Sequence, residues 1–459
     1  MNQQKDIIRD ARVLGTPKML LLGLQHMFAM FGATILVPIL VNSYFQSTSQ
    51  VLSVQVTLFC AGFGTLFFHL CTKFKVPAFL GSSFAFLGGF SSVAALDTGI
   101  FANMADKEKL QYACGGIVVA GLLYLILALI IRCVGVKRVM RFLPPVVTGP
   151  IIICIGLSLA PSAVSNASTN WLIAIVALAV IIIFNIWGKG MFKIIPILLG
   201  VVISYVFALV LQGLGFTNPD GSVILNFSGV SSAAVVGLPP FILPKFNLTA
   251  ILIMAPIAIA TMMEHIGDIS AISATVDENF IEDPGLHRTL IGDGLATALS
   301  AFVGGPANTT YGENTGVLEL SRVHDPRVIR LAAVYAVVLS FIPKVSSIIG
   351  SMPASIIGGV SFILYGMISA IGVRNIVENH VDFTKSRNLI IAAVILVSGL
   401  GFSNGLTFTV GGTSITLTSL AIAALAGVIL NAILPGNDYS FGEDPKADRH
   451  RGIDMNPND

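Results

Sequence analysis

Charged side chains are scarce throughout this chain of 459 residues, and their scarcity argues against a soluble protein. Only 11% of the residues are Asp, Glu, Lys or Arg, whereas soluble globular proteins carry roughly 25%. In place of charge the chain has 54% hydrophobic residues and a mean hydropathy of +0.86. Apolar runs of about 20 residues, each long enough to cross the hydrocarbon of a bilayer, recur from Met19 almost to Pro435. The sequence therefore predicts an all-α polytopic membrane protein.

Cysteine motifs, blocks of like charge and catalytic constellations are also missing. The five cysteines lie in or beside apolar runs without a CxxC pair, so we interpret them as small core residues. The net charge of +2 gives no indication of nucleic-acid binding. The stretch EHIGD lacks the second histidine of a zinc-protease helix, and no nucleophile–base pair is visible. We therefore expect no catalytic residue, no metal site and no cofactor beyond a coupling ion.

Glycine, proline and charged residues mark the ends of fourteen predicted transmembrane segments. These are 19–41, 53–72, 79–96, 112–133, 142–160, 170–188, 192–213, 247–268, 287–303, 306–322, 328–345, 352–372, 387–403 and 416–434. With the N-terminus in the cytoplasm, all but four of the 26 Lys and Arg residues fall on cytoplasmic segments, as the positive-inside rule requires. The exceptions are Lys107, Lys109, Lys245 and Lys344. We therefore expect both termini in the cytoplasm.

Two of these segments are interrupted by polar, helix-breaking residues at the depth of lipid. Segment three begins VPAFLGSSFAF at Val76, and segment ten begins GPANTTYGENT at Gly305, with Pro-Ala at equivalent places. Segments five and twelve share an opening Pro-x4-Gly pattern. An inverted repeat of seven plus seven segments would explain these matches, and such breaks mark the central site of many transporters. We expect each break to form a short strand and then a half-helix, with the strands antiparallel, because uncovered backbone is costly in lipid. A re-entrant loop without a ligand is the alternative.

Few ionisable side chains lie inside the predicted segments, where a charge is costly and usually marks function. They are His26, Glu264, His265, Asp268, Asp293 and Glu313. Glu264 and Asp268 are four residues apart and share a helix face, whereas His265 is rotated by about 100°. Because two like charges repel in a low dielectric, one of this pair should hold a proton at neutral pH. The alternative is that segment eight simply ends there.

Two of these side chains have other expected roles. We interpret Asp293 as a helix-packing or capping partner rather than a ligand, and His26 as either a packing partner of segment ten or a substrate contact. With Glu264, Glu313, Phe84, Tyr311 and the neighbouring amides and hydroxyls, the site would hold two carboxylates and no Lys or Arg. This argues against anionic substrates and favours a small planar ring that offers N–H donors and C=O acceptors.

At these residues the chain resembles the nucleobase–ascorbate transporters, also called nucleobase:cation symporter-2. The segment ENTGVLELSR, from Glu313 to Arg322, is similar to the family signature, with Ser321 in place of its threonine. Gln25-His26, GSSFAF of segment three and EHIGD of segment eight are further matches. The resemblance runs from Gly15 to about Pro435 and is greatest to the bacterial uracil permeases.

The resemblance implies a core and a gate domain within the fourteen-segment fold. The implied divisions are a cytoplasmic N-terminus at 1–18, core parts at 19–141 and 247–350, gate parts at 142–246 and 351–435, and a cytoplasmic tail at 436–459. It also implies roles for site residues. Glu264 and Glu313 would bind opposite sides of the ring, the backbone amides of Phe84 and Gly312 would contact its oxygens, and Tyr365 would face the site from the gate.

The resemblance further implies uracil:proton symport across a bacterial inner membrane by alternating access. Asp268, Glu264 and His26 are the expected proton-coupling residues, supported by Gln25, Ser83 and Asn314. Asp268 stands where the best-known uracil permease type has histidine, and these two side chains titrate in different pH ranges. A homodimer through the gate domain is expected. Xanthine or another purine as substrate, sodium as coupling ion, and an anion carrier or channel of the same fold are the alternatives.

Overall fold

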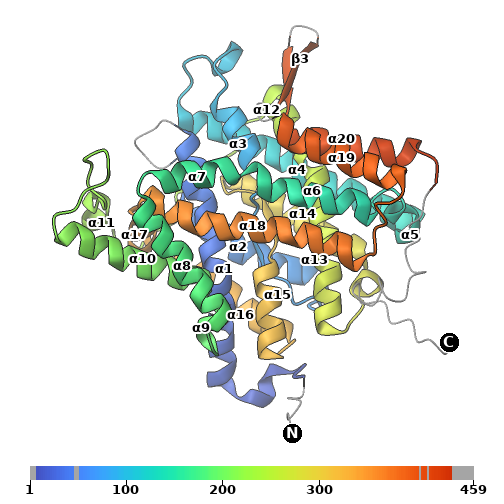
Figure 1. The fold of residues 1–459 in the computed structure, drawn as a ribbon. Helices are drawn as coiled ribbons and strands as arrows, with labels where there is room; N and C mark the ends of the chain where they lie inside the picture. Colours follow the sequence, from blue (N-terminus) through green and yellow to red (C-terminus); the bar gives the residue numbers. More distant parts are fainter. Residues whose placement is uncertain (1–6, 46–50, 403–404, 411–412, 437–459) are drawn as a thin grey trace.

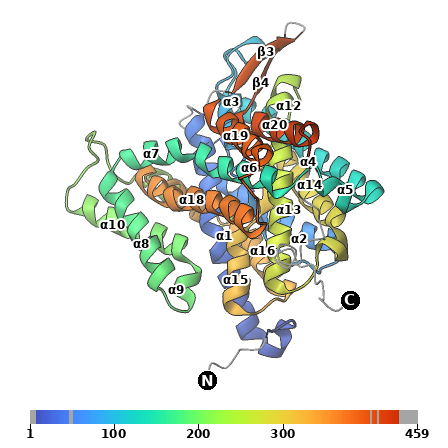
Figure 2. The same cartoon turned by 45° about the vertical axis from the view of Figure 1, so that its right-hand side comes forward.

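The computed structural model describes residues 7–45, 51–402, 405–410 and 413–436, and this part of the chain is mostly helical. Figure 1 shows the helices, and Figure 2 shows them turned by 45°. The predicted tail at 436–459 lies, apart from Gly436, outside the described residues, as do residues 1–6 of the predicted N-terminal segment. By length and composition, seven described helices can cross a membrane, or eight if the pair bent by 85° at residues 341–342 is one span.

A first set of elements packs around the crossing of two short strands. It comprises α1 (Thr16–Tyr44), α2 (Val54–Cys71), β1 (Leu80–Ser82), α3 (Leu87–Ala94), α4 (Asp106–Val134), α12 (Leu248–Met254), α13 (Ile257–Val276), α14 (Leu286–Phe302), β2 (Asn308–Thr310), α15 (Gly312–Ser321) and α16 (Pro326–Ser340). Within this set α14 packs along α4 and α2, and α16 packs along α2 and α1. Glycines allow the close approach, since a Cβ atom at Gly62 would lie 2.4 Å from the Ala333 carbonyl oxygen, and one at Gly121 2.5 Å from the Gly294 carbonyl oxygen.

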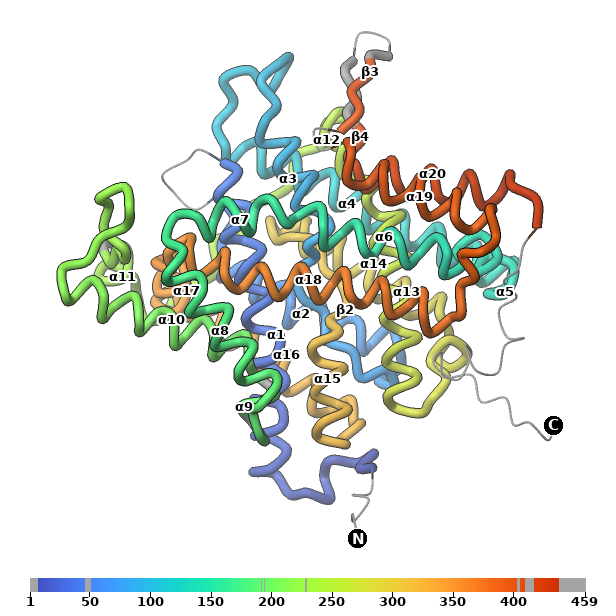
Figure 3. The backbone as a smooth tube through the Cα atoms, viewed as in Figure 1, coloured from blue at the N-terminus to red at the C-terminus, as the bar shows by residue number. Residues whose placement is uncertain are grey.

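A second set of helices packs mainly on its own members. It comprises α6 (Pro145–Ser158), α7 (Ala160–Ser168), α8 (Trp171–Trp187), α10 (Pro196–Gly213), α18 (Ala354–Glu378), α19 (Ser386–Gly401) and α20 (Ser419–Ile433). Helix α18 packs against α6, α7 and α8, and Figure 3 shows it passing the region of β2 and α15 near the middle of the molecule. The site described below lies between the two sets.

Short elements connect these helices or lie at their ends. They are η1 (Ala11–Leu14), η2 (Gly99–Phe101), α5 (Val136–Met140), α9 (Met191–Ile194), α11 (Ser228–Ser232), η3 (Ile281–Gly285), α17 (Pro343–Gly350), β3 (Leu406–Val410) and β4 (Thr413–Leu417). The sequence does not predict the antiparallel β3–β4 pair, which includes the first two residues of the predicted segment 416–434. Near the N-terminus, Ile8 bridges to Val323, and the Ala11 amide donates to Asp325 Oδ2 at 2.7 Å, so this segment is held against the loop after α15.

Two helices that line the site have different bounds from the predicted segments. Segment eight is broken at Pro256 into α12 and α13, and α13 continues to Val276. Asp268 is therefore followed by two further helical turns, so the helix itself does not end at these acids. Helix α18 continues to Glu378, six residues beyond the predicted end of segment twelve at 372.

Candidate functional site

The centre of the site is the antiparallel crossing of β1 and β2. Gly81 is opposite Thr309, with Leu80 opposite Thr310 and Ser82 opposite Asn308. These are the two segments in which the sequence predicts extended backbone. All six strand residues are buried, so their backbone groups are satisfied inside the protein rather than by solvent.

A threonine from a neighbouring helix supports each strand. Thr65 of α2 accepts a hydrogen bond from the Leu80 amide at 2.9 Å. Thr297 of α14 accepts one from the Asn308 amide at 3.2 Å and donates to the Asn308 carbonyl at 3.1 Å. The strands are therefore fixed by side chains of the helices that precede them in the sequence.

Tyr311 packs on the strand crossing and holds the two strands together. Its hydroxyl donates to the Ser82 carbonyl at 3.0 Å, and its ring lies directly over Gly81. A Cβ atom at Gly81 would lie 2.2 Å from Cζ of Tyr311, so this position needs glycine for close approach. Tyr311 also ends the extended stretch, because α15 begins at the next residue.

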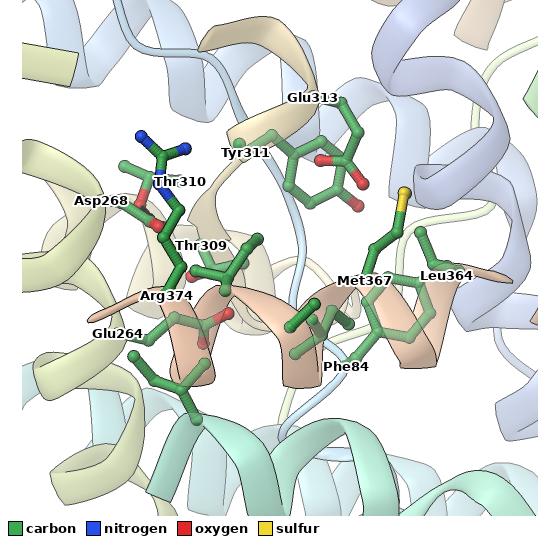
Figure 4. Close-up of a pocket in the computed structure, with 15 residues that line it drawn as sticks. Phe84, Glu264, Asp268, Thr309, Thr310, Tyr311, Glu313, Leu364, Met367 and Arg374 are labelled. Atoms are coloured by element: carbon green, nitrogen blue, oxygen red, sulfur yellow. Dashed lines mark hydrogen bonds between the residues drawn. The ribbon is translucent and has the colours of Figure 1, made fainter. Parts of the chain in front are cut away.

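A cavity of about 360 Å³ adjoins this crossing, between α13, the β2–α15 junction and α18 (Figure 4). It is lined by Phe84, Ile152, Glu264, Asp268, Thr309, Thr310, Tyr311, Gly312, Glu313, Leu364, Met367, Ile368, Ala370, Ile371 and Arg374. In the view of Figure 4, Arg374, Asp268 and Thr310 lie toward one edge and Phe84, Leu364 and Met367 toward the other. A largely apolar cavity with a few convergent polar groups is the usual form of a small-molecule site.

Three acids from two elements face this cavity. Glu264 and Asp268 lie one turn apart on α13, and Glu313 lies in the first turn of α15. The Thr310 hydroxyl donates to Asp268 Oδ2 at 2.5 Å. Among the described residues, Glu264 Oε2 is buried without a hydrogen-bond partner. The first turn of α15 also presents free backbone N–H groups and the positive end of the helix dipole. The cavity thus combines carboxylate acceptors with backbone donors.

His265 does not line the cavity and is rotated by about 100° around α13 from Glu264. Its Nδ1 atom is 2.9 Å from Oδ2 of Asp293 on α14, and both side chains are fully buried. This agrees with the interpretation of Asp293 as a helix-packing partner. Among the described residues, no group of three or more His, Cys, Asp or Glu side chains is placed to hold a metal ion.

Several residues predicted for the site do not line the cavity. His26 is buried against α15, where the Asn314 side-chain amide donates to its carbonyl oxygen at 3.0 Å and lies 3.3 Å from its Nδ1. This is the packing alternative for His26. The Tyr365 ring packs edge-to-face against the Phe84 ring, with 5.9 Å between the two ring centroids. Ser83 is buried beside the crossing, and Gln25 lies outside the cavity lining.

Sequence reasoning missed Arg374. The prediction that the site would hold no Lys or Arg was wrong, because α18 extends past residue 372 and brings Arg374 to the cavity wall. Its Nε donates to Glu378 Oε1 at 2.6 Å, one helical turn further on. An Arg–Glu pair at i and i+4 directly after an apolar run was the signal that the helix continues.

Comparison with known proteins identifies the family. A profile of the permease family matches residues 17–408. The chain is 42% identical over 432 residues to the uracil permease of Bacillus subtilis, covering 90% of this chain and 92% of that protein. The chain belongs to the nucleobase–ascorbate transporter family. It is therefore a multi-pass membrane transporter and not an enzyme.

Other relatives agree with this assignment. The uracil permease of Bacillus caldolyticus is 40% identical over 451 residues, covering 95% of this chain and 96% of that protein. The putative pyrimidine permease RutG of Escherichia coli is 38% identical, covering 90% of this chain and 88% of that protein. These alignments span nearly the whole of each chain.

Solved structures show the same fold at low sequence identity. The transmembrane domain of the cyanobacterial bicarbonate transporter BicA superposes with a TM-score of 0.58 at 14% identity, covering 93% of this chain and all of that one. The murine anion transporter Slc26a9, in its inward-facing state, superposes with a TM-score of 0.62 at 11% identity, covering 94% and 73%. At such identities the likeness concerns the fold alone.

Proposed function

We propose that the chain imports uracil with protons across the inner membrane of a bacterium by alternating access. The observation that carries this proposal is the arrangement of Glu264 and Glu313 on two elements around one cavity, beside the free N–H groups of α15. A pyrimidine ring can donate its N–H groups to the carboxylates and accept from backbone amides through its carbonyl oxygens. The relatives named uracil permeases support the choice of ring.

Glu264, Glu313, Gly312, Phe84 and Tyr311 are the substrate contacts of this proposal, since all of them line the cavity. Tyr365 would act through Phe84, against whose ring it packs. A core domain at 19–141 and 247–350 would move against a gate domain at 142–246 and 351–435. The two packing sets support this division, because α18 of one set and α13 and α15 of the other form the cavity walls.

An inverted repeat of fourteen segments fits the packing of the helices. The long helices, the bent pair, the shorter apolar helices, α14 and the two strand–helix units would account for fourteen segments. Equivalent helices of the two halves make equivalent contacts. Helix α4 packs on α14 as α16 packs on α2, and α8 packs on α10 as α19 packs on α20. Helix α1 packs on α10 as α13 packs on α20. A pseudo-two-fold axis through the β1–β2 crossing would produce these pairs.

Proton coupling would use the acids on α13. Glu264 and Asp268 share a face, and the second already accepts a hydrogen bond from Thr310. Two neighbouring carboxyl groups in a low dielectric hold a proton between them more readily than either alone. His26 would contribute by holding Asn314 at the start of α15. Both termini would lie in the cytoplasm, and the gate helices would form a homodimer.

Removal of either central carboxylate should abolish uracil uptake. Glu264→Gln keeps the shape of the side chain, and Glu313→Ala removes the second acceptor; each loses charge-assisted hydrogen bonds worth about 1.5–3 kcal/mol. We expect uptake of radiolabelled uracil by cells lacking their own permease to fall below about one-tenth of wild type for each. Glu282→Gln, in an exposed turn, is the matched control.

Membrane abundance measured in the same cells separates loss of transport from loss of protein. Wild-type rates in Glu264→Gln or Glu313→Ala would contradict the assignment. Thermal stabilisation of the detergent-solubilised chain by a panel of nucleobases tests the ring, with stabilisation by uracil and not by xanthine expected. Abolition of uptake by a proton ionophore tests the coupling ion.

A further inference from the structure

Two further cavities lie on either side of the central one. The first lies between α3, the α6–α7 junction and the facing ends of α19 and α20, and Phe84 is the lining residue that it shares with the central cavity. The second lies between α13, α15, α6 and α18. It shares five lining residues with the central cavity: Ile152, Asp268, Gly312, Ile371 and Arg374. The central cavity therefore continues into the second cavity and is bounded from the first by an aromatic side chain.

Phe84 forms this boundary together with Tyr365. Their ring planes are inclined by 74°, in an edge-to-face arrangement between a residue beside β1 and one on α18. On the other side, the shared wall contains two charged side chains, Asp268 and Arg374, beside two isoleucines. In the proposed orientation the second cavity faces the cytoplasm, because it is lined by the end of α18 that precedes Lys385 and Arg387. In that orientation, the cavity that is continuous with the central one lies on the cytoplasmic side, as expected of an inward-facing transporter.

Arg374 stands where the two continuous cavities meet. Of the described residues that line them, it alone is basic. Its Nε atom donates to Glu378, and among the described residues its terminal nitrogens have no other hydrogen-bond partner. The side chain is 67% exposed. A guanidinium group has five donors and does not lose its charge, so it retains unused donors directed at the cavity region.

Glu319 lies on the facing wall of the second cavity. It belongs to α15, six residues after Glu313, which places it about 9 Å further along the helix axis, away from the central cavity. It is exposed and has no ion-pair partner among the described residues. Opposite charges thus stand on the two walls of one cavity, one on a helix of each packing set.

We propose that Arg374 and Glu319 form the cytoplasmic gate of the transport cycle. The two side chains are apart in this inward-facing arrangement. They form an ion pair when the core domain moves against the gate domain, and this pairing closes the second cavity on the cytoplasmic side of the substrate. Glu378 holds the guanidinium on its own helix while the gate is open. The inference rests on the proposed alternating access and adds the residues that close one side.

Asp268 is a less suitable partner for closing the cavity. Its Oδ2 atom already accepts the Thr310 hydroxyl, and it lines the central cavity as well as the second one. Pairing there would hold the guanidinium at the wall of the substrate site, which both residues line. Glu319 lines only the second cavity, so its pairing with Arg374 would seal the exit and leave the site free.

A charge exchange tests the gate. Arg374→Glu and Glu319→Arg place like charges on both walls, and we expect each to reduce uracil uptake about tenfold because the exit no longer closes. The double variant restores opposite charges and should recover at least about half of wild-type uptake. Arg138→Glu, on the exposed surface of α5, is the control for loss of one positive charge. A double variant no better than the worse single variant would overturn the proposal.

A cross-linking measurement makes the test independent of the substrate. Arg374→Cys with Glu319→Cys, in a chain whose Cys71 and Cys133 are replaced by serine, should form a disulfide in oxidised membranes, detected by mass spectrometry. The pair Arg138→Cys with Glu319→Cys is the control. Cross-linking no higher than in this control would refute the gate. If the wild-type chain takes up no uracil, the proposed substrate fails while this measurement still decides whether the two walls meet.

Discussion

A methyl group added at Gly81 would collide with the Tyr311 ring, which packs directly on the β1 backbone. We expect Gly81→Ala to destabilise the protein by about 1–3 kcal/mol, because the ring and the strand crossing must move apart. Gly88→Ala is the matched control, since a Cβ there would meet no atom within 4 Å. Thermal unfolding in detergent measures the difference. Equal unfolding temperatures for the two variants would show that the ring is not held against the strand.

At the residue scale the acids were predictable and their neighbours were not. Glu264, Asp268 and Glu313 stand out because a carboxylate inside an apolar segment is costly and needs a reason. The two α13 acids share a face by helical period alone. Arg374 and Tyr365 could not be placed in this way, since which face α18 turns to the cavity depends on packing against distant segments. The roles of the acids in transport remain predictions.

At the scale of elements, hydropathy located the segments but not where their helices end. The apolar run ends near residue 372, yet α18 continues to Glu378 because the Arg374–Glu378 pair supports another turn. Helix α13 likewise runs to Val276 and ends at Asp277, whose positive φ of 58° closes the last turn. Polar residues can extend a helix beyond lipid, so composition alone places its end too early.

The threonines that support β1 and β2 should have equivalent effects in the two halves. Thr65→Val and Thr297→Val each leave a buried strand amide without its acceptor, at a cost of about 1–3 kcal/mol. Thr57→Val is the control, because its hydroxyl donates only to Ser53 within the start of its own helix. Thermal unfolding of the three variants measures this. A cost at one strand only would contradict the equivalence of the halves.

At the scale of the whole molecule, the equivalent helix contacts of the two halves and the two cavities beside the central one lead us to expect a single motion. This motion would close one cavity and open the other. Rotation of one packing set against the other would close the cavity beside Ser270 of α13 and open the cavity beside Ser165 of α7. Because both cavities are lined by helices of the two packing sets, we expect one cavity to close as the other opens.

Accessibility of single cysteines at these two positions should therefore change in opposite directions. In a chain with Cys71 and Cys133 replaced, we expect Ser270→Cys to react with an impermeant thiol reagent from the cytoplasmic side of inverted vesicles, and Ser165→Cys to react from the other side of intact cells. The gate variant Arg374→Glu, which disfavours closure of the exit, should raise labelling at Ser270→Cys and lower it at Ser165→Cys. A change in the same direction at both positions would mean that the cavities open independently. The rigid motion of one packing set against the other would then have to be abandoned.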